Sequence, residues 1–406
     1  MSADLPAGIL PGYAGQAPVE QAPRDVGIWQ RVLAQSGTLA PAGREDRLNP
    51  GHPLDAGMLF GLAGGIGFMV FTFEYAEVTT ATIVPRFHPG PFVGNLLRRC
   101  GAEVRQAETT SAKVAQRNLD EALDAGRAVV VRVTRGALPW SGGGLADQDP
   151  VDLAVAGRGS GGYIVDDASG LLRTLAPGQL AQARARRRQD RNWQAHVAAP
   201  GALTREELAG RVREAITETC AALLAVEAPA GIPARFAKNF GLAGLRTWIE
   251  RLRDTRTKKG WTAMFADPAR LFCGLRRVHE SLEQDWGPMG GALRTDYAAF
   301  LAAARDLPGL HRVDPGDYYR LGERWSAFAD LVLGNGQVPL LEQYRSSLGQ
   351  AAGRGFDTAD PDFQEFTGWA ETHRAGHFAA LADALEPILE AEQAAARRLA
   401  GAVGIT

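Results

Sequence analysis

Hydrophobic and polar positions change their spacing about halfway along this chain of 406 residues. In the first part, short stretches with helical spacing interchange with runs of β-branched residues. Residues 25–35 place Val26, Trp29 and Val32 on one face, which predicts a short amphipathic helix that ends at Gly37. The interchange of helices and strands continues to about residue 170 and predicts an α+β domain.

Glycines interrupt the most apolar stretch of the chain. Residues 54–75 predict a buried helix that passes through Gly64 and Gly65 into an apolar strand. The sequence RGSG at 158–161 predicts a tight hairpin turn. The other elements expected in this part are helices at 91–100 and 118–126 and strands at 102–110, 127–133, 151–157 and 162–169.

The second part of the chain has helical spacing almost throughout. Thr204 and Glu207 form a capping-box pattern at the start of its first long helix. Helical patterns continue to Leu399, and no strand is expected after residue 170. We therefore predict a poorly ordered arm at 1–22, an α+β domain at 23–195 and an all-helical domain at 196–406.

Composition and charge exclude several classes of function. Hydrophobic residues make up 45% of the chain, enough for a sizeable core, and the net charge of −2 argues against a dedicated nucleic-acid binder. The three cysteines form neither a disulfide framework nor a zinc pattern, which fits a reducing cytoplasm. No apolar run reaches the roughly 18 residues that cross a membrane, and the N-terminus has no signal-peptide pattern. We expect a cytoplasmic protein without cofactor or metal. Whether it forms a homo-oligomer stays open.

Several motifs resemble one family of biosynthetic proteins. In the first part they are LDAGMLFGLAGGIGF (54–68), NLLRRCGAEV (95–104), AVVVRVTRGALPW (128–140) and the two strands of the expected hairpin. In the second part they are NFGLAGLRTWIERL (239–252), KKGWTAMF (258–265) and GGALRTDYAAFLAAA (290–304). These motifs resemble the butirosin-biosynthesis H-type acyltransferases. The resemblance implies a papain-like N-terminal domain followed by a helical domain.

The resemblance also implies a reaction, and the chain departs from its residue pattern. In the family a His-Cys pair opens the first helix, a histidine lies on a later strand, and an acidic residue follows it. The cysteine thiolate would take an acyl group from a carrier-protein thioester and pass it to an amine. Pro23 and Arg24 stand where the His-Cys pair is expected, and Asp152 stands in place of the histidine. The acidic position is Asp167 or its neighbour Asp166.

Three aspartates are therefore the candidates for catalysis. Asp152 lies in an apolar strand, where a buried carboxylate without a partner would have a raised pKa. If Asp167 faced it across the hairpin, the two carboxyl groups could share a proton and divide acid and base roles. The alternative is that Asp152 lies at an exposed strand edge or caps a loop.

A second set of residues is expected to bind substrate. Its members are Arg24, Gly64, Gly65, Glu74, Tyr75, Trp248 and Arg294. The glycines indicate close backbone packing or an oxyanion cavity lined by amides, and Arg294 either binds an anionic group or braces two helices. Glu74 and Tyr75 either point into the same cleft or are ordinary strand-end residues. We expect the main pocket at the domain interface, between residues 61–67 and the helices near Trp248 and Arg294.

Other reactive residue types have simpler interpretations. Cys100 ends a helix, where the dipole disfavours a thiolate. His373 and His377 have the spacing of a helical metal pair, but such pairs are commoner than metal sites. The arginine-rich segment 181–191 predicts a solvated linker helix, with a docking patch for an acidic carrier protein as the alternative.

Two functions follow from these observations. The first is an acyltransferase-like or cyclase-like enzyme of natural-product biosynthesis, which forms an amide, an ester or a ring from a small or carrier-bound acyl substrate without a cysteine nucleophile. The second is a non-catalytic pseudoenzyme that binds a pathway intermediate or an acyl carrier protein. A buried, strained carboxylate pair at Asp152 would favour the enzyme, and an exposed Asp152 would favour the binding protein.

Overall fold

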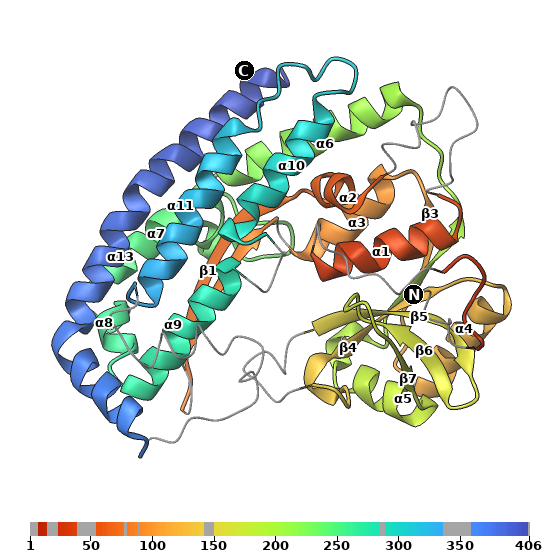
Figure 1. Cartoon of the computed structure of the whole chain (residues 1–406), viewed down its shortest axis with the longest axis horizontal. Coiled ribbons are helices and arrows are strands. Elements are labelled where there is room, and N and C mark those ends of the chain that lie inside the picture. Colours follow the sequence, from red (N-terminus) through yellow and green to blue (C-terminus); the bar gives the residue numbers. More distant parts are fainter. Residues whose placement is uncertain are drawn as a thin grey trace, which may run out of the picture. The chain divides into compact units, whose positions relative to one another are not determined.

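The computed structural model of the chain describes residues 7–13, 23–38, 54–76, 79–87, 89–141, 150–283, 289–335 and 359–404 (Figure 1). These residues form two compact units. The first unit is built from the described parts of 1–60 and 93–208, and the second from those of 61–92 and 209–406. The domain boundaries expected from sequence stay a prediction, although the segment 61–92, assigned there to the first domain, packs in the second unit.

The first unit contains a six-stranded antiparallel sheet with the strand order β3-β8-β4-β5-β6-β7. Its strands are β3 (Glu103–Ala107), β4 (Val129–Thr134), β5 (Pro150–Gly159), β6 (Gly162–Asp166), β7 (Leu172–Leu175) and β8 (Gln194–Ala199). The hairpin predicted around RGSG is the antiparallel pair of β5 and β6. The sheet thus accounts for every strand that the sequence predicts between residues 102 and 169.

Helices cover both faces of this sheet. The helix α1 (Arg24–Gln35) contacts β4, β5 and β8, while α4 (Ala112–Asp124) and α5 (Pro177–Ala185) contact β4. Alternate residues of β4, from Val129 to Val133, pack with apolar residues of α4 and α5 in one buried cluster. Figure 1 shows α1 and α5 on opposite sides of the strands. The predicted amphipathic helix at 25–35 is therefore confirmed as α1.

The expectation of no strand after residue 170 is wrong, since β7 and β8 both lie beyond it. The sequence of β8, QAHVAA, has few β-branched residues. Its polar side chains Gln194 and His196 are nonetheless buried, because β8 lies between β3 and β4. Polar residues in an inner strand hide the apolar pattern on which strand prediction depends.

The arginine-rich segment is not one solvated helix either. The helix α5 ends at Ala185, and a separate short turn covers Arg188–Asp190. Arg184 is buried, and it donates a hydrogen bond to Gln194 at 3.0 Å. Burial lowers the pKa of Arg184 to about 10. The docking role of the exposed arginines in this segment stays a prediction.

The N-terminal arm is ordered where the structure describes it, at residues 7–13. The backbone N–H of Leu10 donates to the carbonyl of Ala156 on β5 at 2.8 Å, and the Tyr13 ring is buried. This part of the arm extends the sheet beside β5, which differs from the poor order expected for residues 1–22.

The second unit combines a β-hairpin with helices. The strands β1 (Ile66–Glu74) and β2 (Thr79–Arg86) pair antiparallel. The described helices that lie entirely in this unit are α7 (Gly241–Arg253), α8 (Trp261–Met264), α9 (Pro268–Glu283), α10 (Arg294–Ala304), α11 (Gly316–Val332) and α13 (Pro361–Ala402). Three further helices, α2 (Ala56–Leu62), α3 (Pro89–Arg99) and α6 (Arg205–Leu224), contain the points where the chain passes between units.

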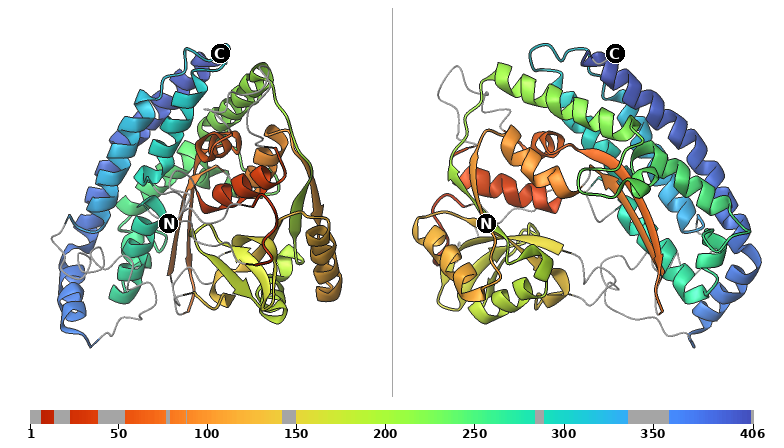
Figure 2. Two further views of the ribbon diagram at one scale, coloured as in Figure 1. Left: turned by 45° about the vertical axis from the view of Figure 1, so that its right-hand side comes forward. Right: turned by 180° about the vertical axis from the view of Figure 1, so that it is seen from behind.

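An aromatic core holds the hairpin and the helices of the second unit together. Phe68 and Val70 of β1 belong to one buried cluster with side chains of α7, α9, α11 and α13. Figure 2 shows the long helix α13 running beside α7 and α11, with which it makes contact. The predicted helical second part and the α+β class of the whole chain are confirmed. In the described ranges, no helix is long and apolar enough to span a membrane.

Candidate functional site

The first candidate site lies on the sheet face beneath α1, where the structure places Asp152. Asp152 on β5 lies directly opposite Arg132 on β4. The guanidinium donates to both carboxylate oxygens, from Nε at 2.7 Å and from Nη2 at 3.1 Å. The Asp152 side chain is only 5% exposed, so this is a largely buried bidentate ion pair. Asp152 therefore neither pairs with a second carboxylate nor lies exposed at the strand edge, the two outcomes expected from sequence.

The electrostatics of this pair favour the charged form of both partners. Burial lowers the pKa of Arg132, but the charge of Asp152 and its hydrogen bonds more than offset this and raise it overall. The Trp193 ring flanks the same guanidinium, 4.8 Å from its central carbon. An adjacent guanidinium stabilises a carboxylate and so makes it a weaker base.

Asp166 is fully buried in a second arrangement on β6. It forms an ion pair with Arg31 of α1 at 2.5 Å and accepts hydrogen bonds from the Tyr13 hydroxyl at 2.8 Å and the Ala168 N–H at 2.7 Å. Burial and the neighbouring Asp166 charge raise the pKa of Tyr13 well above its ordinary value, so Tyr13 stays a neutral donor. These contacts fix the N-terminal arm and α1 to the sheet.

The pairing expected between Asp152 and Asp167 is not formed. In the hairpin register Ala154 lies opposite Asp166, and successive side chains of a strand point to opposite faces. Asp152 therefore shares a face with Asp166, whereas Asp167 follows on the other face. There its carboxylate accepts a hydrogen bond from the Trp140 indole at 3.0 Å. The carboxyl groups of Asp152 and Asp167 thus have separate partners and do not share a proton.

Arg24 lies at the start of α1, where the family pattern has its cysteine. It is the first residue of the helix and is exposed, with Pro23 as the preceding cap residue. Its substrate-binding role stays a prediction.

All three cysteines are poor nucleophiles in this fold. Burial raises the pKa of Cys100 to about 11 and that of Cys220 to about 12, and it also raises that of Cys273. The Cys100 thiol donates to the Leu97 carbonyl of its own helix at 3.2 Å. The sequence-based interpretation of Cys100 as a small core residue fits this environment.

Gly64 and Gly65 serve close packing in the second unit. Gly64 has a φ of +116°, and a Cβ there would lie 2.5 Å from the Phe87 ring. Its carbonyl accepts the Thr219 hydroxyl at 2.6 Å, and the Gly65 carbonyl accepts the Phe87 N–H at 3.0 Å. These contacts favour the packing interpretation of the glycines over an oxyanion cavity.

Arg294 and Trp248 lie inside the same unit as these glycines. Arg294 is 1% exposed, pairs with Glu392 at 2.6 Å and donates to the carbonyls of Pro85 and Gly67. Arg294 therefore connects α10, α13 and the hairpin. This fits the interpretation that it braces helices rather than binds an anionic group. Trp248 is fully buried among aromatic rings. The elements expected on two sides of an interface pocket therefore belong to one packed unit.

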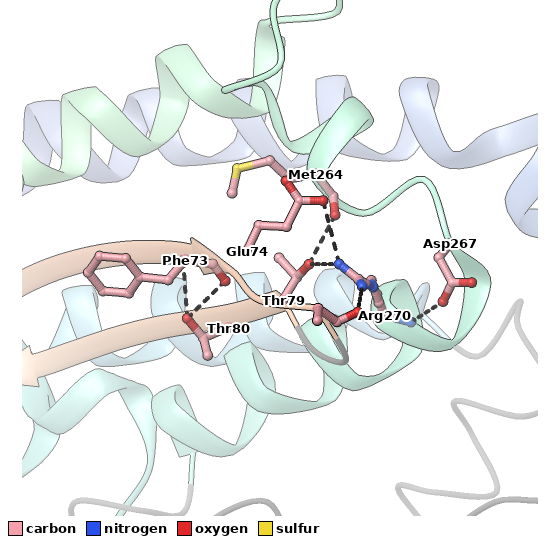
Figure 3. Close-up of polar contacts among 8 residues, drawn as sticks. Phe73, Glu74, Thr79, Thr80, Met264, Asp267 and Arg270 are labelled. Carbon is pink, nitrogen blue, oxygen red and sulfur yellow. Dashed lines mark hydrogen bonds and ion pairs between the residues drawn. The ribbon is translucent and has the colours of Figure 1, made fainter.

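Glu74 is the last residue of β1 (Figure 3), and Tyr75 follows it in the chain. The Glu74 carboxylate is 3.5 Å from Arg270 of α9, which also donates to the Ala76 carbonyl at 2.6 Å. Tyr75 is 56% exposed. These contacts tie the hairpin end to α9 and describe strand-end residues, while their role in substrate binding stays a prediction.

A pocket that the sequence did not predict lies wholly in the second unit, although the motifs at 239–252 and 258–265 contain several of its lining residues. It has a volume of about 360 Å³ and is bordered by β1, a short turn at Ala234–Asn239 and α7. Within the described part of the chain, no three potential metal ligands cluster. His373 and His377 instead contact backbone carbonyls, of Trp369 at 3.1 Å and Val332 at 3.2 Å.

One comparison with known proteins agrees with the resemblance in the first part of the chain, and the motifs of the second part lie outside the matched stretch. Residues 37–167 match the family model described as Butirosin biosynthesis protein H, N-terminal. This stretch includes Asp152, Asp166 and Asp167, while Arg24 and the rest of α1 precede it. A search of curated proteins found no match. The resemblance to the butirosin-biosynthesis H family is thus confirmed over this part of the chain.

Proposed function

We propose that this protein acts in natural-product biosynthesis as an acyltransferase-related binding protein with a papain-like first domain. In this role it holds a pathway intermediate or an acyl carrier protein and forms no acyl-enzyme. The matched family supports the biosynthetic setting and the relation to acyltransferases. The non-catalytic role is the alternative that the sequence left open.

The observation that carries this proposal is the bidentate pair of Asp152 and Arg132. A general base must be free to take up a proton during the reaction, with a pKa near the working pH. A guanidinium that binds both oxygens of a buried carboxylate stabilises the charged form and opposes that proton transfer. Arg24 cannot replace the cysteine in covalent catalysis, because a guanidinium is always protonated and is not a nucleophile.

A reconstituted acyl-transfer assay tests the proposal. The protein is mixed with an acyl carrier protein that bears a short acyl thioester and with an amine acceptor. We expect calorimetry to detect binding of the loaded carrier or of the free acyl compound. Intact-mass spectrometry should find no acyl adduct on the protein and no transfer above the rate without it. A covalent adduct, or transfer that Asp152→Asn abolishes without unfolding, would decide for the enzyme.

A further inference from the structure

The pocket of the second unit has one wall made of aromatic rings. Phe71 and Phe73 are two positions apart on β1, so they point to the same side of the strand, and their rings stack at 5.7 Å with an angle of 10°. Phe236 meets Phe71 edge to face at 5.6 Å. Phe73 is 45% exposed, which is unusual for so large an apolar side chain. A ligand that covers these rings would remove apolar surface from water.

Cationic side chains line the same pocket, and the Arg235 guanidinium lies over the Phe236 ring, 4.7 Å from its centre. Arg235, Lys238, Arg251 and Lys259 line the pocket. Only two acidic residues do so, Glu250 and Asp254. Hydrogen bonds from Thr257 and Arg256 lower the pKa of Asp254 and hold its carboxylate in a local turn. The lining therefore has an excess of cationic groups.

Arg251, which lines the pocket, and Arg253, on the same helix, differ in their ion-pair partners. Both lie in the last turn of α7, where the helix dipole favours cations. Arg253 forms ion pairs with Asp383 and Glu386, each at 2.5 Å. Arg251 is partly buried, and burial lowers its pKa. Its guanidinium has no hydrogen-bond or ion-pair partner among the residues that the structure describes, and it lines the pocket, so it is available to an anionic ligand there.

We propose that this pocket binds a small organic anion, whose carboxylate or phosphate contacts Arg251 and the neighbouring lysines while its aromatic or extended apolar body lies on Phe71, Phe73 and Phe236. The volume falls in the range of small-molecule sites, which begins at roughly 300 Å³. The guanidinium fork matches both head groups, since each offers two oxygens in one plane. This site does not depend on the function proposed above, because it uses no residue of the first unit.

Calorimetry with three small ligands of one shape tests the charge requirement. The ligands are 2-naphthoate, 2-naphthyl phosphate and the neutral 2-naphthamide, each titrated into the full-length protein. We expect both anions to bind at least about tenfold more tightly than the amide, and their affinity alone to fall as salt is added. The stronger anion identifies the head group. Equal affinity for all three ligands, or no binding of either anion, would overturn the proposal.

Matched variants locate the binding. Arg251→Gln should weaken anion binding about tenfold and leave the amide unchanged, whereas Arg246→Gln, an exposed arginine on the same helix outside the pocket, should change neither. Phe73→Ser should weaken the binding of all three ligands, and Tyr319→Ser, at an exposed tyrosine of α11 outside the pocket, should weaken none. If Arg251→Gln does not fold, Lys238→Gln, an exposed residue, makes the same test. Anion binding that survives removal of Arg251 or Lys238 would contradict the assignment.

Discussion

Asp152 accepts hydrogen bonds from Arg132 through both carboxylate oxygens, at 2.7 and 3.1 Å, across the register of β4 and β5. From the sequence, we expected the Asp152 carboxyl group to share a proton with Asp167. The structure instead provides a cation, which keeps the carboxylate charged. This relationship underlies both the proposed binding role and the stability of the sheet face beneath α1.

Replacing Arg132 by methionine should lower the free energy of unfolding by about 3 kcal/mol, because it leaves a largely buried carboxylate without its bidentate partner. The matched control is Arg158→Met. Arg158 is 40% exposed and pairs with Asp120 and Asp124, so its removal should cost less than about 1 kcal/mol. Urea unfolding at neutral pH measures both values. A loss of equal size in the two variants would contradict this account of Asp152.

Tyr13→Phe should destabilise the first unit by about 2 kcal/mol, since it removes a buried hydroxyl that donates to a carboxylate. Tyr163→Phe is the comparison, because the Tyr163 hydroxyl donates to Asp120 at 2.7 Å in a partly buried place. Its loss should be smaller. Thermal unfolding of both variants checks this order, and the reverse order would show that the arm contributes little to the fold.

Asp296 should make stability depend on pH. Its carboxyl is 1% exposed, and burial raises its pKa to about 7. The folded state then holds a proton that the unfolded state has lost, so the free energy of unfolding should fall as pH rises from about 4 to about 7, by up to roughly 1.4 kcal/mol per pH unit. Asp296→Asn should remove this decline and stabilise the protein above that range. Denaturant unfolding across pH measures the slope.

Asp317 is a control of opposite sign for the pH experiment. Burial raises the pKa of its carboxyl, but hydrogen bonds from Arg398 and Arg320 more than compensate and lower it overall. Asp317 should therefore contribute stability that is lost as pH falls. If Asp296→Asn and Asp317→Asn changed the pH profile in the same direction, the role assigned to Asp296 would be wrong.

Thiol chemistry should be slow in the folded protein. Iodoacetamide at mildly alkaline pH should modify Cys273 first, since it is partly exposed, while Cys100 and Cys220 should react only after unfolding. Cys100→Ala should keep any activity of the wild type. Mass spectrometry of digests at successive times follows each site, and rapid modification of Cys100 in the folded protein would refute the prediction.

The sequence predicted much of the fold because local patterns determine it. The hairpin of β5 and β6 combines strands that contain β-branched residues with a turn that contains glycine. The capping box at Thr204 and Glu207 forms as expected, with hydrogen bonds of 2.8 and 3.2 Å. The strand β8 was missed because its burial depends on neighbours that are distant in sequence. The same reason explains why β1 and β2 were not assigned to the helical unit.

The candidate site was less predictable than the fold. Aspartates could be found from the motif, but their partners Arg132, Arg31 and Trp140 come from other segments of the chain: a strand, a helix and a turn. The pocket of the second unit was not predicted, although two quoted motifs contain Arg251 and Lys259, because β1, the turn before α7 and α7 itself supply its residues separately. Spacing in sequence gives the face of one element and not the residues that another element brings to it.

The most direct test of the central claim is complementation of a producing strain that lacks this protein. Wild type and Asp152→Asn are supplied in turn, after circular dichroism has shown that the variant is folded, and the pathway product is measured. Asparagine retains an oxygen that can accept a hydrogen bond from Arg132, but it cannot act as a general base. The proposed binding role predicts that both proteins restore the product to similar levels. A folded Asp152→Asn variant that restores none would show that Asp152 takes part in catalysis and would contradict the claim.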